Sequence, residues 1–267
     1  MPVDPDNPVP ETGEVANVRW QYMPAASLAS ASEAWLSPAE RALLATFRSP
    51  LRQADWLRGR MAAKQLLMEM GVVRDARPSE LEITTRNLRG QGIPPEVRLG
   101  GERLPVVLSL SHTAEGILVA CGDDVRARVG VDLVRPTEIH PEALSVWLTP
   151  GERSQIDRTS AHDVAAVWAA KEAVYKAACV NESFAPMQVE TVRKGETWNC
   201  RFFGRRIDRL SLITREMDGQ IAAIAVVQPA RTLVREVIQR DGGARDTATD
   251  NPSKPHTGTL RVVFAPS

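Results

Sequence analysis

The stretch from Trp168 to Lys176, WAAKEAVYK, holds the side chains best suited to phosphate chemistry. On a helix, Glu172 would lie one turn from Lys176, with Lys171 beside it. A carboxylate can bind a divalent cation, and an ammonium can contact phosphate oxygens. The same i, i+4 spacing is also typical of a surface ion pair that contributes about 0.2–0.5 kcal/mol. The spacing alone therefore permits both a phosphate site and a solvated pair.

A single acidic residue interrupts an apolar run upstream of this stretch. The alternation in Val129–Val134, VGVDLV, predicts a β-strand that places Gly130, Asp132 and Val134 on one face. A carboxylate there is costly unless a cation or hydrogen bonds compensate it. We expect Gly130 to leave room for a bulky ligand beside Asp132. We interpret Asp132 as a metal ligand, with turn capping or pairing to an arginine as the alternative.

Four features follow one another along the chain: LSLSHT at Leu108–Thr113, GVD at Gly130–Asp132, Glu152, and WAAKEAVYK at Trp168–Lys176. This ordered series resembles the phosphopantetheinyl transferases, in particular the larger, pseudo-dimeric class of the surfactin-synthetase-activating type. The resemblance covers roughly residues 17–228. It implies an α+β fold of two similar α/β lobes related by pseudo-twofold symmetry, with the active site at their interface.

The resemblance also implies roles for individual residues. Asp132 and Glu172 would bind Mg²⁺, or Mn²⁺ in its place, together with the diphosphate of coenzyme A, the co-substrate. Ser111, His112, Lys171 and Lys176 would contact phosphate oxygens. The catalytic residues that the resemblance implies are Asp132, Glu152, Glu172 and Lys176.

Glu152 has two interpretations. In the family, the matching acid is proposed as a neighbour of the metal or as a base acting on the incoming serine. Thr149-Pro150-Gly151-Glu152 is also a capping box with proline at the first helical position, so Glu152 could simply begin a helix. Both interpretations stay open at this point.

The sequence departs from the family pattern at Val134. Many members of the class carry Glu two residues after the Asp, where this chain has Val134, so the metal would have one carboxylate fewer. Magnesium needs only one or two carboxylates when phosphates and waters complete its shell.

Arg52 and Arg60 lie on a helix predicted over residues 51–70, which matches a basic, coenzyme-facing helix of the family. They are candidates for coenzyme binding, with solvated helix charges as the alternative.

The domain organisation predicted is a disordered tail over residues 1–16, a first lobe over 17–124, a second lobe over 125–228 and a tail or extension over 229–267. A capping box at Ser37 opens a predicted helix to about Arg48, and Gly71 ends the helix over 51–70. The remaining predicted elements are a loop over 90–101, strands over 106–111, 116–121 and 128–134, a helix over 162–179, an antiparallel meander with segments 189–193, 198–203, 210–215 and 221–227, a helical segment over 231–240, and an edge strand over 260–264.

Composition excludes some classes of function. The chain has 33 acidic and 33 basic residues, so it lacks the charge of a general nucleic-acid binder. Cys121, Cys179 and Cys200 are too far apart for a common metal motif, and we interpret them as reduced thiols. The N-terminus is acidic and proline-rich rather than basic and then apolar, and no apolar run approaches the length of a membrane span. We expect a cytoplasmic monomer without nucleic-acid or membrane partners.

The function implied is transfer of the 4'-phosphopantetheine arm of coenzyme A to a serine hydroxyl of an apo acyl or peptidyl carrier protein, releasing adenosine 3',5'-bisphosphate. One alternative is a non-catalytic relative that binds coenzyme A or a carrier domain. A metal-dependent nuclease or phosphodiesterase is less favoured, because its lysine commonly follows the acid by two residues and Lys176 follows Glu172 by four.

Overall fold

The computed structural model describes residues 10–86, 92–136, 144–157, 159–178, 185–195 and 197–229. All of the described residues belong to one compact unit, which lies within Met1–Ala230. The segments predicted over 231–240 and 260–264 therefore lie outside the described residues, as does Cys179.

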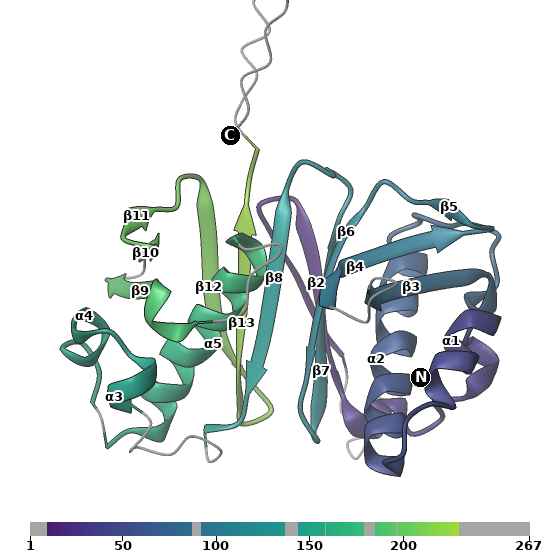
Figure 1. Cartoon of the computed structure of the whole chain (residues 1–267), viewed down its shortest axis with the longest axis horizontal. Helices are drawn as coiled ribbons and strands as arrows, with labels where there is room; N and C mark the ends of the chain where they lie inside the picture. The colour runs from purple at the N-terminus through teal and green to yellow at the C-terminus, as the bar shows by residue number, and fades with distance from the viewer. Residues whose placement is uncertain are drawn as a thin grey trace, which may run out of the picture. The chain divides into compact units, whose positions relative to one another are not determined.

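The N-terminal elements form two antiparallel sheets and one long helix (Figure 1). One sheet has the order β1-β2-β7-β6, and the other has the order β3-β4-β5. The elements are β1 Glu11–Val15, β2 Val18–Pro24, the 3-10 helices η1 Ala25–Leu28 and η2 Glu33–Trp35, α1 Pro38–Leu44, α2 Pro50–Glu69, the 3-10 helix η3 Pro78–Glu80, β3 Leu81–Arg86, β4 Gly92–Leu99, β5 Glu102–Arg103, β6 Val107–His112 and β7 Gly116–Gly122.

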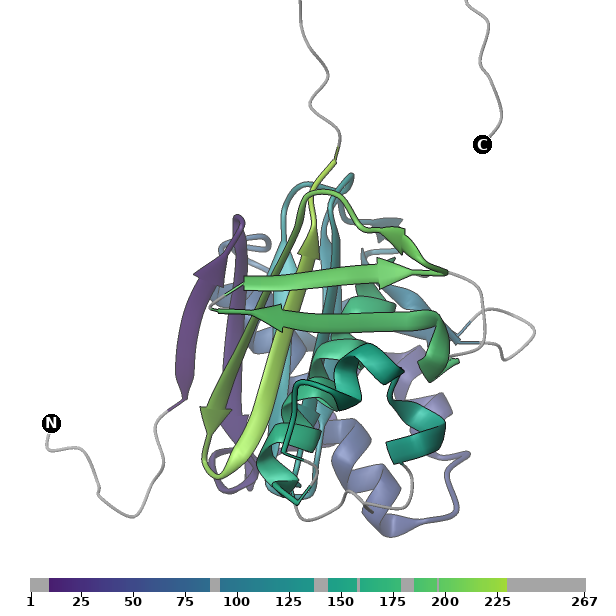
Figure 2. The same cartoon turned by 90° about the vertical axis from the view of Figure 1, so that its left-hand side faces the viewer.

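The C-terminal elements again form two antiparallel sheets and one long helix (Figure 2). The sheets have the orders β12-β13-β8 and β11-β10-β9. The elements are β8 Arg128–Val134, α3 Leu144–Trp147, α4 Pro150–Arg153, α5 Ala161–Ala178, the 3-10 helix η6 Pro186–Gln188, β9 Val189–Lys194, β10 Thr197–Phe202, β11 Arg205–Arg206, β12 Leu210–Met217 and β13 Gln220–Val227.

The two series match element by element. In each, a strand leads through a capping-box helix and a long helix to a 3-10 turn, a three-stranded sheet and a closing hairpin. The match extends to register: Leu99 pairs with Glu102 between β4 and β5, and Phe202 pairs with Arg205 between β10 and β11. The third strand of each small sheet thus begins at an equivalent position.

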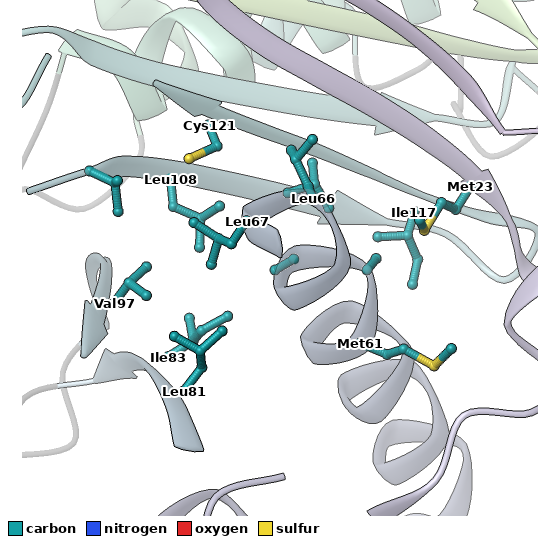
Figure 3. Close-up of a cluster of buried hydrophobic side chains, with 14 of the residues drawn as sticks. Met23, Met61, Leu66, Leu67, Leu81, Ile83, Val97, Leu108, Ile117 and Cys121 are labelled. Atoms are coloured by element: carbon teal, nitrogen blue, oxygen red, sulfur yellow. The ribbon is translucent and has the colours of Figure 1, made fainter. Parts of the chain in front are cut away.

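Three of the four apolar clusters of the described residues hold the sheets and the long helices together. The first lies between α2 and the strands of its half, with Leu66 and Leu67 of α2 among its buried members (Figure 3). A second packs α5 against β8 and β13. The third joins the halves, because it combines β2 and β7 side chains such as Trp20 and Leu118 with Val131 of β8. At this junction the backbone N–H of Val131 donates to Ser109 Oγ of β6 at 3.1 Å.

Most of the predicted elements are confirmed. The capping box at Ser37 begins α1, although α1 ends at Leu44 rather than near Arg48. Helix α2 spans Pro50–Glu69, and Gly71 follows it with φ +70°. The predicted strands and the helix over 162–179 are present within a residue or two of their predicted limits. Cys121 and Cys200 are buried free thiols.

Three expectations are wrong. Residues 11–15 form β1 rather than a disordered tail, because Ala16 and Asn17 adopt positive φ and turn the chain so that β1 pairs with β2. Residues 92–99 form β4 rather than a loop, with Val97 buried in the first cluster. The four predicted meander segments are divided between two separate sheets.

Gly130 also has another role than the one expected. A Cβ atom there would lie 2.1 Å from the carbonyl oxygen of Ala173 and 2.6 Å from the backbone nitrogen of Ala177. The glycine therefore admits the backbone of α5, not a bulky ligand. Within the described part of the chain, no helix is both long and apolar enough to span a membrane.

Candidate functional site

Asp132 lies on β8 at the junction of the two halves and is almost fully buried. Its Oδ1 atom accepts hydrogen bonds from Ser111 Oγ at 2.9 Å and from Lys176 Nζ at 2.7 Å. These partners come from β6 and α5, so residues 21 and 44 positions away converge on one carboxylate oxygen. The pairing with lysine and serine replaces the predicted alternative of an arginine partner or a turn cap.

Lys176 lies between two carboxylates. Its Nζ atom is 2.7 Å from Asp132 Oδ1 and 3.6 Å from Glu172 Oε2, and it donates to the carbonyl oxygen of Val131 at 3.0 Å. Burial lowers the pKa of Lys176, but Asp132 and Glu172 outweigh that effect and leave the pKa raised. The ammonium is therefore charged, and its closer partner is Asp132 rather than the i, i+4 residue Glu172.

Glu172 adds a second carboxylate to the cluster. Its side chain is 28% exposed, whereas that of Asp132 is 7% exposed. Burial is the main cause of a raised pKa at Glu172, the negative charge of Asp132 adds to it, and Lys176 opposes both. Two carboxylates share a single ammonium here, so a further cation would be stabilised between them.

Ser111 and His112 end strand β6 beside Asp132. The Ser111 hydroxyl donates to Asp132, while the exposed His112 side chain makes no hydrogen bond to another described residue. Of these two residues predicted to contact phosphate, Ser111 thus touches the acidic pair, and the imidazole of His112 faces solvent at the next position of the strand.

Glu152 and Lys171 lie elsewhere, in a sealed ion pair with both side chains 0% exposed. Lys171 Nζ donates to both Glu152 oxygens, at 2.9 and 2.7 Å, and to the carbonyl oxygen of Val189. Glu152 also accepts from the backbone nitrogens of Thr149 and Thr191, each at 2.7 Å. Burial lowers the pKa of Lys171, and Glu152 counteracts it. The predicted capping box of Thr149 and Glu152 is confirmed.

The first half contains the same arrangement at Glu40 and Lys64. Lys64 Nζ donates to Glu40 Oε2 and to the carbonyl oxygen of Leu81, and the backbone nitrogens of Ser37 and Ile83 donate to Glu40. Each half therefore joins a capping box, a lysine of its long helix and the first strand of its small sheet. This recurrence was not predicted, although the pattern Ser/Thr-Pro-x-Glu occurs in the sequence at both 37–40 and 149–152.

The two predicted arginines differ in their surroundings. Arg52 is exposed near the start of α2, with its guanidinium 4.8 Å from the centre of the Phe47 ring. Arg60 is 2% exposed and lies 4.4 Å from the centre of the Trp56 ring. It donates to Thr85 at 3.1 Å and lies 3.5 Å from Glu40. Arg60 is thus part of the Glu40 cluster and has no contact with Asp132.

Val134 and Trp168 have packing roles. Val134, two residues after Asp132, is buried in the cluster under α5. The ring of Trp168 stacks against Trp147 at 4.6 Å between centroids and so holds α3 against α5. Neither side chain supplies a metal ligand.

The donor set is compatible with magnesium or manganese. Among the described residues, no group of three or more His, Cys, Asp and Glu side chains could hold a metal ion. Asp132 and Glu172 nevertheless share one ammonium, and Mg²⁺ is commonly held by one or two carboxylates with phosphates and waters completing the shell. The two carboxylates could hold such a cation with the phosphates of a bound substrate.

Comparison with known families gives the context of this cluster. Residues 128–224, which contain Asp132, Glu172 and Lys176, match the family model of the 4'-phosphopantetheinyl transferase superfamily. Over this segment the chain is similar to that superfamily. The comparison with curated proteins gave no match.

Several solved structures of acyl-carrier-protein synthases are similar to part of this chain. Holo-[acyl-carrier-protein] synthase of Thermotoga maritima is 19% identical, over 39% of this chain and 64% of its own, with a TM-score of 0.31. Acyl carrier protein synthase of Mycobacterium tuberculosis is 26% identical over 39% and 97%, and the apo structure from Chronobacterium ammoiniagenes is 21% identical over 38% and 94%, both at a TM-score of 0.31. The present chain thus spans less than two thirds of the length of the Thermotoga synthase.

Proposed function

We propose that this protein is a magnesium-dependent phosphopantetheinyl transferase. It would transfer the 4'-phosphopantetheine arm of coenzyme A to a serine hydroxyl of an apo carrier protein and release adenosine 3',5'-bisphosphate. The observation that carries the proposal is the convergence of Asp132, Glu172 and Lys176, which lie within the segment that matches the superfamily model, with Ser111 contributed from β6 outside that segment.

The proposed reaction needs no covalent bond between the protein and its substrates. The serine Oγ–phosphorus bond forms while the bond from that phosphorus to the bridging diphosphate oxygen breaks, and the serine proton is released. A bound divalent cation would neutralise charge on the diphosphate. Lys176 supplies a fixed ammonium for the phosphoryl oxygens, whose charge is redistributed in the transition state, and His112 supplies a solvent-facing donor for the phosphates. Asp132 and Glu172 hold the cation.

Glu152 is assigned a positioning role in this scheme. A general base needs a free oxygen within hydrogen-bond reach of the serine, but both Glu152 oxygens already accept bonds from Lys171 and the backbone. The equivalent Glu40 makes the same bonds in the first half. Lys171, whose ammonium is sealed against Glu152, is assigned the same role, and Arg52 is preferred to the buried Arg60 for coenzyme binding.

The pseudo-twofold lobes remain part of the proposal. We divide the unit into lobes over residues 17–124 and 125–228, and the recurring element order, register and Glu–Lys pairs support a duplication. Cytoplasmic location and a monomeric state stay predictions from the sequence.

The test is incubation with Mg²⁺, coenzyme A and an apo carrier domain, followed by intact-mass measurement of the carrier. The carrier should gain the mass of the phosphopantetheine arm, and Asp132→Asn should abolish the gain. Binding of coenzyme A or carrier without any mass gain would favour the non-catalytic relative and overturn the proposal.

A further inference from the structure

Two equivalent hairpin turns differ in their chemistry. The turn between β4 and β5 is Gly100-Gly101, and the turn between β10 and β11 is Phe203-Gly204 (Figure 1). The flanking registers are the same, since Arg98 pairs with Arg103 and Arg201 pairs with Arg206. The Gly100-Gly101 turn of the first half can therefore be compared directly with the Phe203-Gly204 turn of the second half.

The turn requires positive φ at both central residues, as in a type I′ turn. The φ angles are 59° and 88° at Gly100 and Gly101, and 49° and 74° at Phe203 and Gly204. Glycine adopts this conformation freely, whereas a bulky residue there is strained. Phe203 is also 53% exposed, so burial does not explain its presence. Such strain is characteristic of positions retained for function.

A second exposed apolar side chain lies beside Phe203. The Phe203 backbone nitrogen donates to the carbonyl oxygen of Gln188 at 2.8 Å. Met187, the residue before Gln188, is 48% exposed. In the first half the 3-10 turn η3 carries Ser79 at the position that Met187 holds in η6. Two positions that are Ser and Gly in one half are therefore Met and Phe in the other.

The charges of the strands that follow the two turns also differ. Strand β5 is Glu102-Arg103, whereas β11 is Arg205-Arg206, and both β11 side chains are exposed. Arg103 pairs with Glu96 at 3.3 Å, but neither Arg205 nor Arg206 has an ion-pair partner within the described residues. The second half thus presents two uncompensated guanidinium groups next to two exposed apolar side chains.

This surface is connected to the candidate site through α5. Lys171 Nζ donates to the carbonyl oxygen of Val189, the residue that follows η6. Glu172 is the next residue of α5 after Lys171. A macromolecule that binds at η6 and β11 would therefore lie on the half of the protein that carries Asp132, Glu172 and Lys176.

We infer that Met187, Phe203, Arg205 and Arg206 form the docking surface for the acidic face of the apo carrier protein. The inference rests on the proposed function, which requires a macromolecular serine substrate. Exposed aromatic, methionine and arginine side chains are the types enriched at protein interfaces. Guanidinium groups without partners favour a partner that presents carboxylates, and they steer its approach.

Phe203→Gly, which copies Gly100, and Arg205→Glu, which copies Glu102, test the surface. Each should raise the KM for the apo carrier by about tenfold or more, with kcat and the KM for coenzyme A nearly unchanged. Phe203→Gly should also keep or raise the Tm, because glycine relieves the strained φ. The matched control is Arg103→Glu on the first-half hairpin, which should leave the carrier KM unchanged.

A binding measurement separates this inference from the proposed function. An apo carrier whose acceptor serine is replaced by alanine should bind wild type more weakly as salt rises, and Arg205→Glu should weaken binding and flatten that salt dependence. If wild type modifies the carrier but neither variant alters the carrier KM or this binding, the docking surface is overturned and the enzyme activity stands. Loss of self-association in Phe203→Gly, with carrier affinity unchanged, would also overturn it by making the surface a contact between copies of the chain. If wild type gives no transfer, the proposed function fails first.

Discussion

The Lys171 ammonium lies 2.7 Å from Glu152 Oε2 in an ion pair that excludes solvent, and Lys64 makes the same contact with Glu40 in the first half. A buried charge left without its partner is strongly destabilising, typically by about 3–5 kcal/mol. The recurrence of this pair in a half that lacks Asp132 and Glu172 indicates a role in folding. The two pairs therefore provide a matched test of whether Glu152 acts in catalysis.

Glu152→Gln and Glu40→Gln should each lower the free energy of unfolding by at least about 3–5 kcal/mol, measured by chemical denaturation. Under conditions where both variants are folded, their turnover numbers should agree within about tenfold. A loss of a hundredfold or more in Glu152→Gln alone would instead identify Glu152 as the base. Replacing both partners, as in Glu152→Gln with Lys171→Met, should recover part of the lost stability.

Removing either carboxylate of the candidate metal site should abolish transfer without unfolding the protein. Asp132→Asn and Glu172→Gln each leave one carboxylate, so the affinity for Mn²⁺, used as a spectroscopic probe, should fall in both variants. Transfer would be followed by intact mass and the fold by circular dichroism. Activity within a few-fold of wild type in either variant would refute the assignment. Glu82→Gln, which changes a carboxylate on β3 of the other half, is the control and should keep wild-type transfer.

The raised pKa of Glu172 predicts a pH-dependent stability in metal-free buffer. The folded protein releases this proton at a higher pH than the unfolded chain, whose carboxyl group has its usual value of 4.5. Wild-type stability should therefore fall as pH rises from about 4.5 through the raised pKa and then level off. Glu172→Gln lacks this fall, so its unfolding free energy relative to wild type should increase between about pH 4 and pH 7. A difference that is constant with pH would show that Glu172 has no raised pKa.

Gly130→Ala should be among the most destabilising single changes on β8. The added Cβ would meet backbone atoms of α5, and these cannot move aside as a flexible side chain can. Overpacking typically costs about 1–3 kcal/mol, and a backbone obstacle should place this variant at the upper end or beyond. Gly92→Ala is the control, because a Cβ there meets no atom within 4 Å. Equal Tm values for the two variants would contradict the close approach of α5 to β8.

The local elements could be predicted from the sequence because their signals are local. The capping boxes at Ser37 and Thr149 and the alternation over Val129–Val134 depend on residues a few positions apart, and all are present. Strand β4 was missed because Pro94, Pro95 and neighbouring glycines obscure its alternation. The strand tolerates these prolines because they lie at a register shift against β3, and because β5 pairs with β4 only at Arg98 and Leu99.

The site could be predicted only in part. The order of motifs indicated that Ser111, Asp132 and Lys176 belong together, but not that both Ser111 and Lys176 donate to the same oxygen. The separation of Lys171 from Lys176 could not be predicted either, since it depends on helix rotation. The two lysines are five positions apart and point to different partners, Glu152 and Asp132. Helical spacing places residues on a face, and only tertiary packing decides what that face meets.

Replacing Lys176 distinguishes a phosphate-binding site from a surface ion pair. If its ammonium served only to pair with acids in the free protein, Lys176→Ala would lower stability, because Asp132 would be left buried without its cation, and it would leave transfer unchanged. The raised pKa keeps it charged, and its 30% exposure leaves it reachable by a phosphate oxygen. Loss of one preorganised donor to a transition state typically lowers turnover by about a hundredfold or more.

We therefore expect Lys176→Ala to lose at least that much turnover while it stays folded, as measured by steady-state transfer kinetics and Tm. Lys176→Arg should restore only part of the rate, because a planar guanidinium cannot reproduce the contacts of a compact ammonium between Asp132, Glu172 and the Val131 carbonyl oxygen. Gln65→Ala, which removes an exposed helix hydrogen bond to Glu69 on α2, is the control and should keep wild-type kinetics. Wild-type turnover in folded Lys176→Ala would return this lysine to a structural role and remove the main support for the site on α5.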